Sequence, residues 1–212
     1  MLLINRKQSD PFFNIAAEEY FLKNFDDEFV MIWQNNPSVV IGKHQNTFAE
    51  INTSYLDEKN IPVIRRISGG GTVFHDDGNL NYSVITKSEK REQLVDFISF
   101  TTPIIEFLKS FELKAEFSGK NNLTINGKKF SGNSAHVHKK RVLHHGTLLF
   151  NSNLNVLEKA ITPADYKITD KAVKSVRAEV TNLSTLIKDS ITITDFQNKF
   201  LSFIRSYYNI TE

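Results

Sequence analysis

The stretch Arg65-Arg66-Ile67-Ser68-Gly69-Gly70-Gly71-Thr72-Val73-Phe74-His75-Asp76 carries the most information in this chain of 212 residues. Three of the nine glycines stand in a row here, behind two arginines and after residues 61–64, which read as a strand. Consecutive glycines let the backbone adopt positive φ and approach a ligand closely. Their N–H groups can form an anion-binding nest, and arginine adds a planar fork for phosphate or carboxylate. The stretch therefore predicts an anion-binding loop between two strands; the simpler interpretation is a flexible turn with two surface arginines.

Two familiar phosphate-binding loops do not fit this stretch. A Walker A loop requires Gly-Lys-Ser or Gly-Lys-Thr at a set spacing, which is missing here. The dinucleotide-binding fingerprint requires a helix after its glycines, whereas Thr72-Val73-Phe74 is β-branched and aromatic and predicts a strand. Neither mode of nucleotide binding is therefore expected.

A second candidate site is the segment Asn126-Gly127-Lys128-Lys129-Phe130-Ser131-Gly132. Asn-Gly between two apolar runs indicates a β-hairpin with a two-residue turn. Successive side chains of a strand point to opposite faces, so only one of the two lysines can face a given ligand. Lys129 is the candidate because the small pair Ser131-Gly132 leaves room beside it. The simpler interpretation is a charged hairpin tip that protects a sheet edge.

Four histidines fall within ten residues, at positions 136, 138, 144 and 145. His136 and His138 would share one face of a strand, as a pair of metal ligands does. No carboxylate stands at close spacing, however, and His144 and His145 would point to opposite faces. We therefore predict no metal site here, but one buried, hydrogen-bonded histidine among surface ones.

Composition limits the classes of function. The chain has no cysteine, which excludes disulfide scaffolds, cysteine-ligated zinc, iron–sulfur clusters and cysteine nucleophiles. Its 26 basic and 24 acidic residues leave a net charge of only +2, which does not favour nucleic acid or a membrane surface as partner. The first ten residues lack the apolar core of a signal peptide, and no run of about 18 apolar residues occurs. We therefore expect a cytoplasmic location.

Local patterns predict an α+β fold with helices packed on a mixed, mostly antiparallel sheet. Asp10-Pro11 predicts a helix start, and Phe13, Ala16, Ala17, Tyr20 and Phe21 recur at helical spacing as its buried face. A helix over 93–110 should bury Phe97, Ile98, Thr101, Ile105 and Leu108, with Pro103 kinking it or marking its start. A last helix should follow a capping box of Thr194 and Gln197. A short helix is expected over 53–59 and strands over 30–33, 38–42, 61–64, 71–74, 80–86, 123–125, 128–130 and 142–150.

In its motifs the chain resembles the lipoate–protein ligases of the A type. Three motifs carry the resemblance: the Arg-Arg-x-Ser-Gly-Gly-Gly-x-Val-Phe-His-Asp-x-Gly-Asn run from Arg65 to Asn79, the Lys-x-Ser-Gly at Lys129, and His144-His145-Gly146-Thr147-Leu148-Leu149. Further matches are Phe13-Asn14-Ile15-Ala16 with Glu18-Glu19, Val40-Ile41-Gly42 with Gln45-Asn46, and Ser175-Val176-Arg177 with Val180-Thr181-Asn182-Leu183. The match runs from about residue 10 to residue 187. It implies a catalytic domain related to that of the biotin ligases.

The resemblance implies a two-step reaction. Lipoate's carboxylate attacks the α-phosphate of ATP and gives lipoyl-AMP and pyrophosphate. A lysine of a lipoyl domain, in a 2-oxoacid dehydrogenase complex or the glycine cleavage H protein, then takes the lipoyl group. ATP and, on its phosphates, Mg²⁺ are implied, with no dedicated metal site in the protein. Attack of one anion on another needs cationic and N–H stabilisation, which suits a lysine and a glycine loop.

Site residues follow from the same motifs. Arg66 is expected to bind a carboxylate or phosphate, and Lys129 to act as the catalytic residue that contacts both the acyl carbonyl and the α-phosphate. The adenylate is expected along one segment, comprising Gly69, Gly70, Gly71, Thr72, Val73, Phe74, His75, Asp76 and Asn79. An apolar slot for the lipoyl tail is expected from Val40, Ile41, Val73 and Phe74.

The chain departs from the family pattern in two places. Many members read Gly-Arg-Asn-Asp-Leu where this chain has Gly119-Lys120-Asn121-Asn122-Leu123, so a carboxylate is missing. We also expect residues 1–212 to form one catalytic domain, without the family's smaller C-terminal domain, and a separate small accessory protein as a possible partner. Two alternatives stay open: a transferase that uses preformed acyl-adenylate, and a non-catalytic lipoate-binding homologue.

Overall fold

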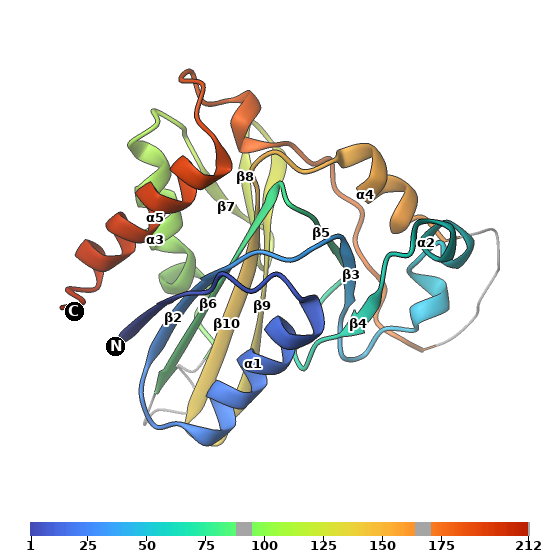
Figure 1. Cartoon of the computed structure of the whole chain (residues 1–212), viewed down its shortest axis with the longest axis horizontal. Coiled ribbons are helices and arrows are strands. Elements are labelled where there is room, and N and C mark those ends of the chain that lie inside the picture. Colours follow the sequence, from blue (N-terminus) through green and yellow to red (C-terminus); the bar gives the residue numbers. More distant parts are fainter. Residues whose placement is uncertain (88–94, 164–170, 212) are drawn as a thin grey trace.

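Two sheets form the framework of the chain, as a computed structural model shows for residues 1–87, 95–163 and 171–211 (Figure 1). In spatial order, the seven strands of the larger sheet are β1 (Leu2–Asn5), β2 (Phe29–Trp33), β6 (Asn79–Lys87), β10 (Arg141–Leu149), β9 (Lys128–His138), β8 (Asn122–Ile125) and β7 (Glu116–Ser118). The smaller sheet has the order β4 (Val63–Arg65), β3 (Ser38–Ile41) and β5 (Val73–His75). Only β1–β2 and β3–β4 pair in parallel among these strands. This confirms the mixed, mostly antiparallel sheet.

Helices cover both faces of the larger sheet. Helices α3 (Phe97–Lys109) and α5 (Ile193–Tyr207) pack on one face, where rings such as Phe107, Phe196 and Phe200 contact one another. Helix α1 (Pro11–Asn24) packs on the opposite face. Helices α2 (Thr53–Lys59) and α4 (Leu154–Ala160) pack against the smaller sheet, and short 3₁₀ turns occupy η1 (Thr47–Ala49) and η3 (Leu183–Thr185). No helix in these described ranges is long and apolar enough to cross a membrane.

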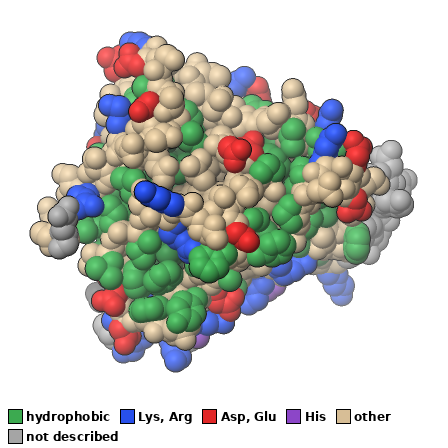
Figure 2. Space-filling view, viewed as in Figure 1, with side chains coloured by type: hydrophobic (Ala, Val, Ile, Leu, Met, Phe, Trp, Pro, Cys, Tyr) green, Lys and Arg blue, Asp and Glu red, His purple; other side chains and the backbone are tan. Residues whose placement is uncertain are grey.

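Helix α1 begins where the sequence predicts but buries a different face. The Asp10 side chain accepts a hydrogen bond from Phe13 N at 3.0 Å, and Pro11 occupies the first turn. The predicted buried face is wrong, because Phe13 and Tyr20 are more than half exposed. The inward residues include Glu18, which is 2% exposed and is held by polar partners from the sheet. Figure 2 shows hydrophobic side chains gathered on the surface over this helix.

Two further helix predictions need correction. The capping box of α5 is formed by Thr192 and Asp195, because the helix begins two residues earlier than the Thr194 and Gln197 pair would require. Helix α3 begins after its N-cap, Asp96, and continues through Pro103, with Ile98 64% exposed. Residue 93, the expected start of α3, lies outside the described residues. The short helix over 53–59 and the hairpin at Asn126-Gly127 are confirmed.

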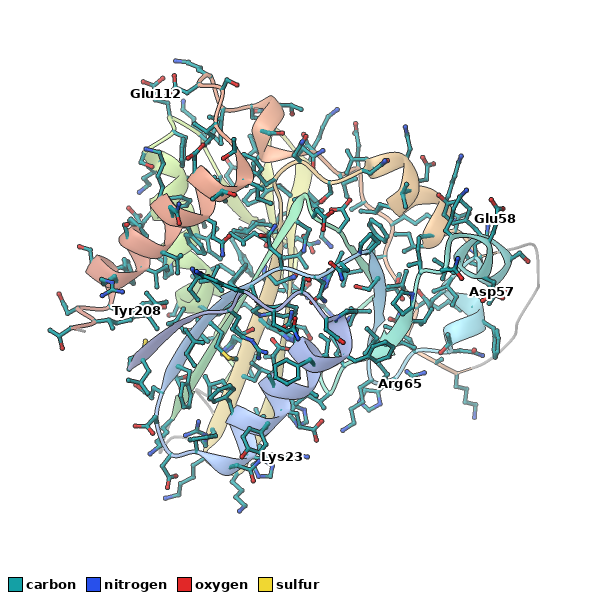
Figure 3. All side chains as sticks on the ribbon, in the orientation of Figure 1. Lys23, Asp57, Glu58, Arg65, Glu112 and Tyr208 are labelled. Carbon is teal, nitrogen blue, oxygen red and sulfur yellow. The ribbon has the colours of Figure 1, made fainter. Side chains whose placement is uncertain are left out.

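Several charged side chains form ion pairs at the periphery of the fold. Figure 3 shows Lys23 at the end of α1 and Glu112 beyond α3, both pointing away from the two sheets. Lys23 pairs with Glu19, and Glu112 pairs with Lys188. Such exposed pairs are screened by water and contribute little to stability.

Two buried histidines make the fold sensitive to acid. Burial lowers the pKa of His75 to about 3 and that of His144 to about 4. A histidine in the unfolded chain takes up its proton near pH ~6.5, so below that pH the unfolded state binds more protons and stability falls as pH falls. His144→Phe keeps the aromatic stack on Phe100, where the ring centroids are 4.7 Å apart. We expect it to recover about 2 kcal/mol of the unfolding free energy lost between pH 7 and pH 5. Denaturant unfolding at both pH values measures this; equal losses in variant and wild type would contradict it.

Candidate functional site

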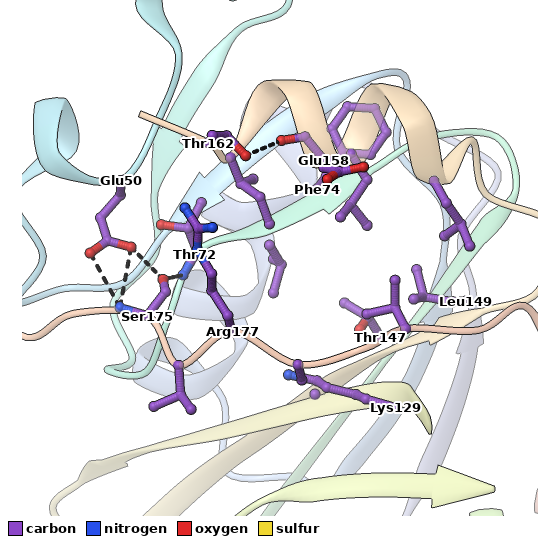
Figure 4. Close-up of a pocket in the computed structure, with 18 of the residues that line it drawn as sticks. Glu50, Thr72, Phe74, Lys129, Thr147, Leu149, Glu158, Thr162, Ser175 and Arg177 are labelled. Atoms are coloured by element: carbon purple, nitrogen blue, oxygen red, sulfur yellow. Dashed lines mark hydrogen bonds between the residues drawn. The ribbon is translucent and has the colours of Figure 1, made fainter. Parts of the chain in front are cut away.

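A cavity of about 580 Å³ lies where the two sheets meet (Figure 4). Its walls come from the start of β5, the start of β9, the end of β10, helix α4 and residues 174–180, which we call the strap. The lining residues include Glu50, Thr72, Val73, Phe74, Lys129, Gly132, Leu149, Leu157, Glu158, Ile161, Lys174, Ser175, Arg177 and Glu179. The cavity is therefore partly apolar and carries cations on two of its walls.

The strap is held over the cavity by Ser175. The Ser175 hydroxyl oxygen accepts a hydrogen bond from Thr72 N at 2.9 Å and from Gln45 Nε2 at 3.0 Å. The same hydroxyl donates to the carboxylate of Glu50, which also accepts from Ser175 N at 3.2 Å. One serine thus joins the strap to the start of β5 and to the segment after β3.

At its other end the strap, together with the next residue, Thr181, pairs with both backbone groups of Lys129 in β9. Lys129 N donates to Glu179 O at 2.8 Å, and Thr181 N donates to Lys129 O at 2.9 Å. The backbone of Lys129 is therefore clamped, which limits the positions that its side chain can reach.

The two lysines of the hairpin have different environments, as predicted. Lys128 is exposed and pairs with Glu179 at 2.6 Å. Lys129 is largely buried in the cavity wall, and its Nζ lies where Gly132 leaves space: a Cβ on Gly132 would be 2.9 Å from that nitrogen. Burial lowers the pKa of the Lys129 ammonium, and nearby Arg66 lowers it further. Within the described ranges this ammonium has no hydrogen-bond or ion-pair partner, so it is available to an anion.

Residues 66–72 form the glycine loop, which Arg66 holds from inside. The Arg66 guanidinium donates to Gly69 O at 2.6 Å, Gly71 O at 2.7 Å, Val40 O at 3.0 Å and Ser68 Oγ at 3.1 Å. Four of its five N–H groups are thus used within the protein. In the part of the chain that the structure describes, the N–H groups of Gly69, Gly70 and Gly71 donate no hydrogen bond. The loop therefore presents free donors, which suits an anion.

A comparison with models of protein families shows which family the chain belongs to. The model of the lipoyl protein ligase A/B catalytic domain matches residues 10–205. The chain belongs to this family.

Curated relatives and a solved structure agree with this membership. Lipoate-protein ligase LplJ of Bacillus subtilis is 42% identical over 207 residues, which are 96% of this chain and 62% of the relative. Lipoate–protein ligase 1 of Staphylococcus aureus is 41% identical over 202 residues, 94% of this chain and 61% of the relative. The structure of P. falciparum LipL1 in complex with lipoate superposes with a TM-score of 0.83 at 29% identity and covers 100% of this chain and 63% of that one. The chain thus spans about three-fifths of the length of these relatives.

The cavity gathers four of the expected site residues: Thr72, Val73, Phe74 and Lys129. Arg66 does not line it, and its direct contact with a ligand stays a prediction, since most of its donors bind the glycine loop. Of the residues expected to form the apolar slot, Val40 and Ile41 are fully buried in the core instead.

The other expected ligand residues also lie outside the cavity lining: Gly69, Gly70, Gly71, His75, Asp76 and Asn79. His75 is buried, with Nδ1 3.1 Å from Asn35 Nδ2. Asp76 accepts from Asn153 N at 2.8 Å, where α4 begins, and Asn79 donates to Asn81 Oδ1 at 2.8 Å. His75 and Asp76 thus lie at the end of β5 and the start of α4, and Asn79 lies in β6. The contact of these residues with an adenylate stays a prediction.

Sequence reasoning assigned no role to Gln45, Glu50 or Ser175. Gln45 and Ser175 stand in matched family motifs, which was the available signal. Gln45 and Glu50 hold the strap by binding Ser175, which is 125 to 130 residues away in the sequence. No local sequence pattern reveals such a contact.

Proposed function

We propose that this chain is a catalytic unit of a lipoate–protein ligase. It activates lipoate with ATP and transfers the lipoyl group to a lysine of a lipoyl domain. In the first step a carboxylate oxygen of lipoate bonds to the α-phosphorus of ATP, and the bond to pyrophosphate breaks. In the second step the acceptor amine bonds to the acyl carbon, AMP leaves, and the amine gives up a proton. The observation that carries the proposal is the largely buried Lys129 ammonium, which has no partner among the described residues and lines the same cavity as Thr72, Val73 and Phe74.

Lys129 serves as the cation at the reacting centre. Two anions must meet at the α-phosphorus, so charge has to be stabilised there before the new bond forms. A partly desolvated ammonium interacts more strongly with such charge than a hydrated one does. Its compact shape also lets it contact the acyl carbonyl and the α-phosphate in turn.

The remaining walls bind the rest of the adenylate. Lys174 and Arg177 of the strap add cationic groups at the cavity, and Figure 4 shows Arg177 extending from the strap toward Thr72. Leu149, Leu157 and Ile161 supply an apolar wall, which can bury the uncharged parts of the ligand. The strap covers the reactive mixed anhydride and so limits its hydrolysis.

Mg²⁺ fits this site as a companion of the phosphates. The described residues hold no group of three or more carboxylate, histidine or cysteine ligands. The Glu50 carboxylate at the cavity is already engaged by Ser175 and that of Glu179 by Lys128, which leaves Glu158 as a wall carboxylate that can contribute. Magnesium commonly binds through substrate phosphates and one or two carboxylates. When bound, it neutralises phosphate charge and orients the leaving pyrophosphate.

The partners belong to the same proposal. Lipoyl domains of 2-oxoacid dehydrogenase complexes or the glycine cleavage H protein are the expected acceptors, with a separate accessory protein as a further candidate and the cytoplasm as the setting. A solved structure of similar fold, 24% identical, is described as a bipartite lipoate protein ligase with its E2 lipoyl domain from Thermoplasma acidophilum. That description applies to the archaeal protein and is the model for our acceptor.

Pyrophosphate release tests the proposal directly. The chain is incubated with ATP, Mg²⁺ and lipoate, with and without a lipoyl domain, beside a reaction that receives synthetic lipoyl-AMP. We expect lipoate-dependent pyrophosphate and then mass addition to the lipoyl domain. Transfer from lipoyl-AMP without pyrophosphate release would favour the transferase alternative. Lipoate binding without either reaction would favour the non-catalytic alternative.

A further inference from the structure

Behind the glycine loop, four buried side chains from distant parts of the sequence form a continuous hydrogen-bonded chain. Arg66 Nε lies 3.1 Å from Ser68 Oγ, and Ser68 Oγ lies 2.6 Å from His145 Nε2. His145 Nδ1 lies 2.9 Å from both carboxylate oxygens of Glu18. All four side chains are less than 10% exposed. We call these residues, Glu18, His145, Ser68 and Arg66, the relay.

One arrangement of protons satisfies the whole relay. Arginine can only donate, so Ser68 Oγ accepts from Arg66 Nε. The Ser68 hydroxyl then donates to His145 Nε2, and a proton on Nδ1 of His145 donates to the Glu18 carboxylate. The donors then point in one direction, from Arg66 to Glu18, with a proton on Nδ1 of His145.

Charge explains why the relay ends on a carboxylate. Burial lowers the pKa of Arg66 to about 10, and Glu18 is the charge that opposes this shift. A buried cation requires a compensating negative charge, and Ser68 and His145 connect Arg66 to that charge through hydrogen bonds. Glu18 is fixed in turn by Ser83, whose hydroxyl donates to Oε1 at 2.5 Å and which lies opposite His145 in the β6–β10 register.

The order of serine, histidine and carboxylate also occurs in acyl-transfer nucleophiles, but the surroundings differ here. Ser68 is fully buried, and its oxygen already accepts a hydrogen bond from Arg66. A substrate carbonyl cannot approach this oxygen without displacing the loop. Positioning, rather than covalent catalysis, fits the geometry.

We propose that Glu18, His145 and Ser68 are positioning residues that orient Arg66, and that Arg66 thereby fixes the Gly69 and Gly71 carbonyls and with them the conformation of the glycine loop. Gly69 O is held from a second side by Ser134 Oγ at 2.9 Å, so the loop has little freedom once Arg66 is in place. The catalytic consequence rests on the function proposed above, whereas the structural part does not.

The first test uses nitrogen-15 NMR of the ligand-free wild-type chain and requires no variant. We expect the His145 ring to carry its proton on Nδ1, with Nε2 unprotonated, and the Arg66 Nε–H to give a slowly exchanging signal. A His145 ring protonated on Nε2 alone would overturn the relay.

The second test removes the charge while keeping the shape. In Glu18→Gln we expect the amide signals of Gly69, Gly70 and Gly71 to shift, and adenylate formation to fall roughly tenfold or more in kcat, since misplacement by about 1 Å can cost 10²-fold. The matched control is His144→Phe, which changes the neighbouring buried residue on the other face of β10 and should leave these signals and the rate at wild-type values.

The outcomes separate the two proposals. Unchanged glycine amide signals in a folded Glu18→Gln variant would overturn the relay, whatever the activity. Shifted signals in Glu18→Gln, together with a wild-type chain that releases no pyrophosphate, would support the relay and overturn the proposed ligase activity.

Discussion

Replacing Lys129 by alanine should lower the rate of acyl-adenylate formation by at least about 10²-fold, the usual effect of removing a preorganised group that stabilises developing charge. The ammonium is largely buried, lacks a partner in the described structure and is clamped through its backbone to the strap. Its loss removes the positive charge from the reacting centre. Pyrophosphate release with ATP and lipoate measures the effect.

Folding should hardly change in the same variant. A desolvated ammonium without a partner costs free energy in the folded state, so its removal should leave the free energy of unfolding equal or slightly higher. Lys128→Ala is the matched control, because that side chain is exposed and loses only its ion pair with Glu179. If Lys129→Ala formed adenylate as fast as Lys128→Ala, Lys129 would have no catalytic role.

The neighbouring glycine offers a second variant for this prediction. A Cβ on Gly132 would stand 2.9 Å from Lys129 Nζ and 3.0 Å from Cε. Gly132→Ala should therefore displace the ammonium without removing it. An activity between those of wild type and Lys129→Ala would show that the position of the charge matters as well as its presence.

Replacing Gly70 by valine should abolish measurable binding of lipoyl-AMP while the chain stays folded. Gly70 has a φ of +85°, which a β-branched residue adopts only with strain. A Cβ there would also lie 3.1 Å from Arg66 Nη2, the atom that holds the Gly69 and Gly71 carbonyls. The loop would have to reorganise, and its N–H groups would lose their alignment. Calorimetric titration with lipoyl-AMP measures the affinity.

Gly119→Val separates strain from loss of the site. Gly119 has a φ of +63° in the turn before β8, and a Cβ there would meet no atom within 4 Å. It carries the same kind of backbone strain outside both the glycine loop and the cavity lining. We expect similar destabilisation in both variants but normal affinity in Gly119→Val. If both variants bound lipoyl-AMP with equal affinity, residues 69–71 would be a flexible turn without a binding role.

Local interactions explain why much of the fold could be predicted. Asp10-Pro11 caps a helix with its own side chain, and Asn126-Gly127 forms a two-residue turn, so neither depends on distant residues. The α1 face was predicted wrongly because periodicity counts apolar residues alone. In the structure a buried polar cluster from β6 and β10 draws Glu18 inward and leaves Phe13 outside against Arg6.

The candidate site divides in the same way. The sequence by itself was enough to predict the glycine loop and the family, because the order of motifs is a property of the linear chain. It was also enough to predict that Lys129 and Lys128 lie on opposite faces, because side chains alternate along a strand. Only the tertiary structure shows that Arg66 binds the carbonyls of the glycine loop and that Ser175 holds the strap through Gln45, Glu50 and Thr72. The physical reason is that a buried donor must find an acceptor. Arg66 binds Val40 O, 26 residues away, besides the loop carbonyls, and Ser175 binds Glu50, 125 residues away.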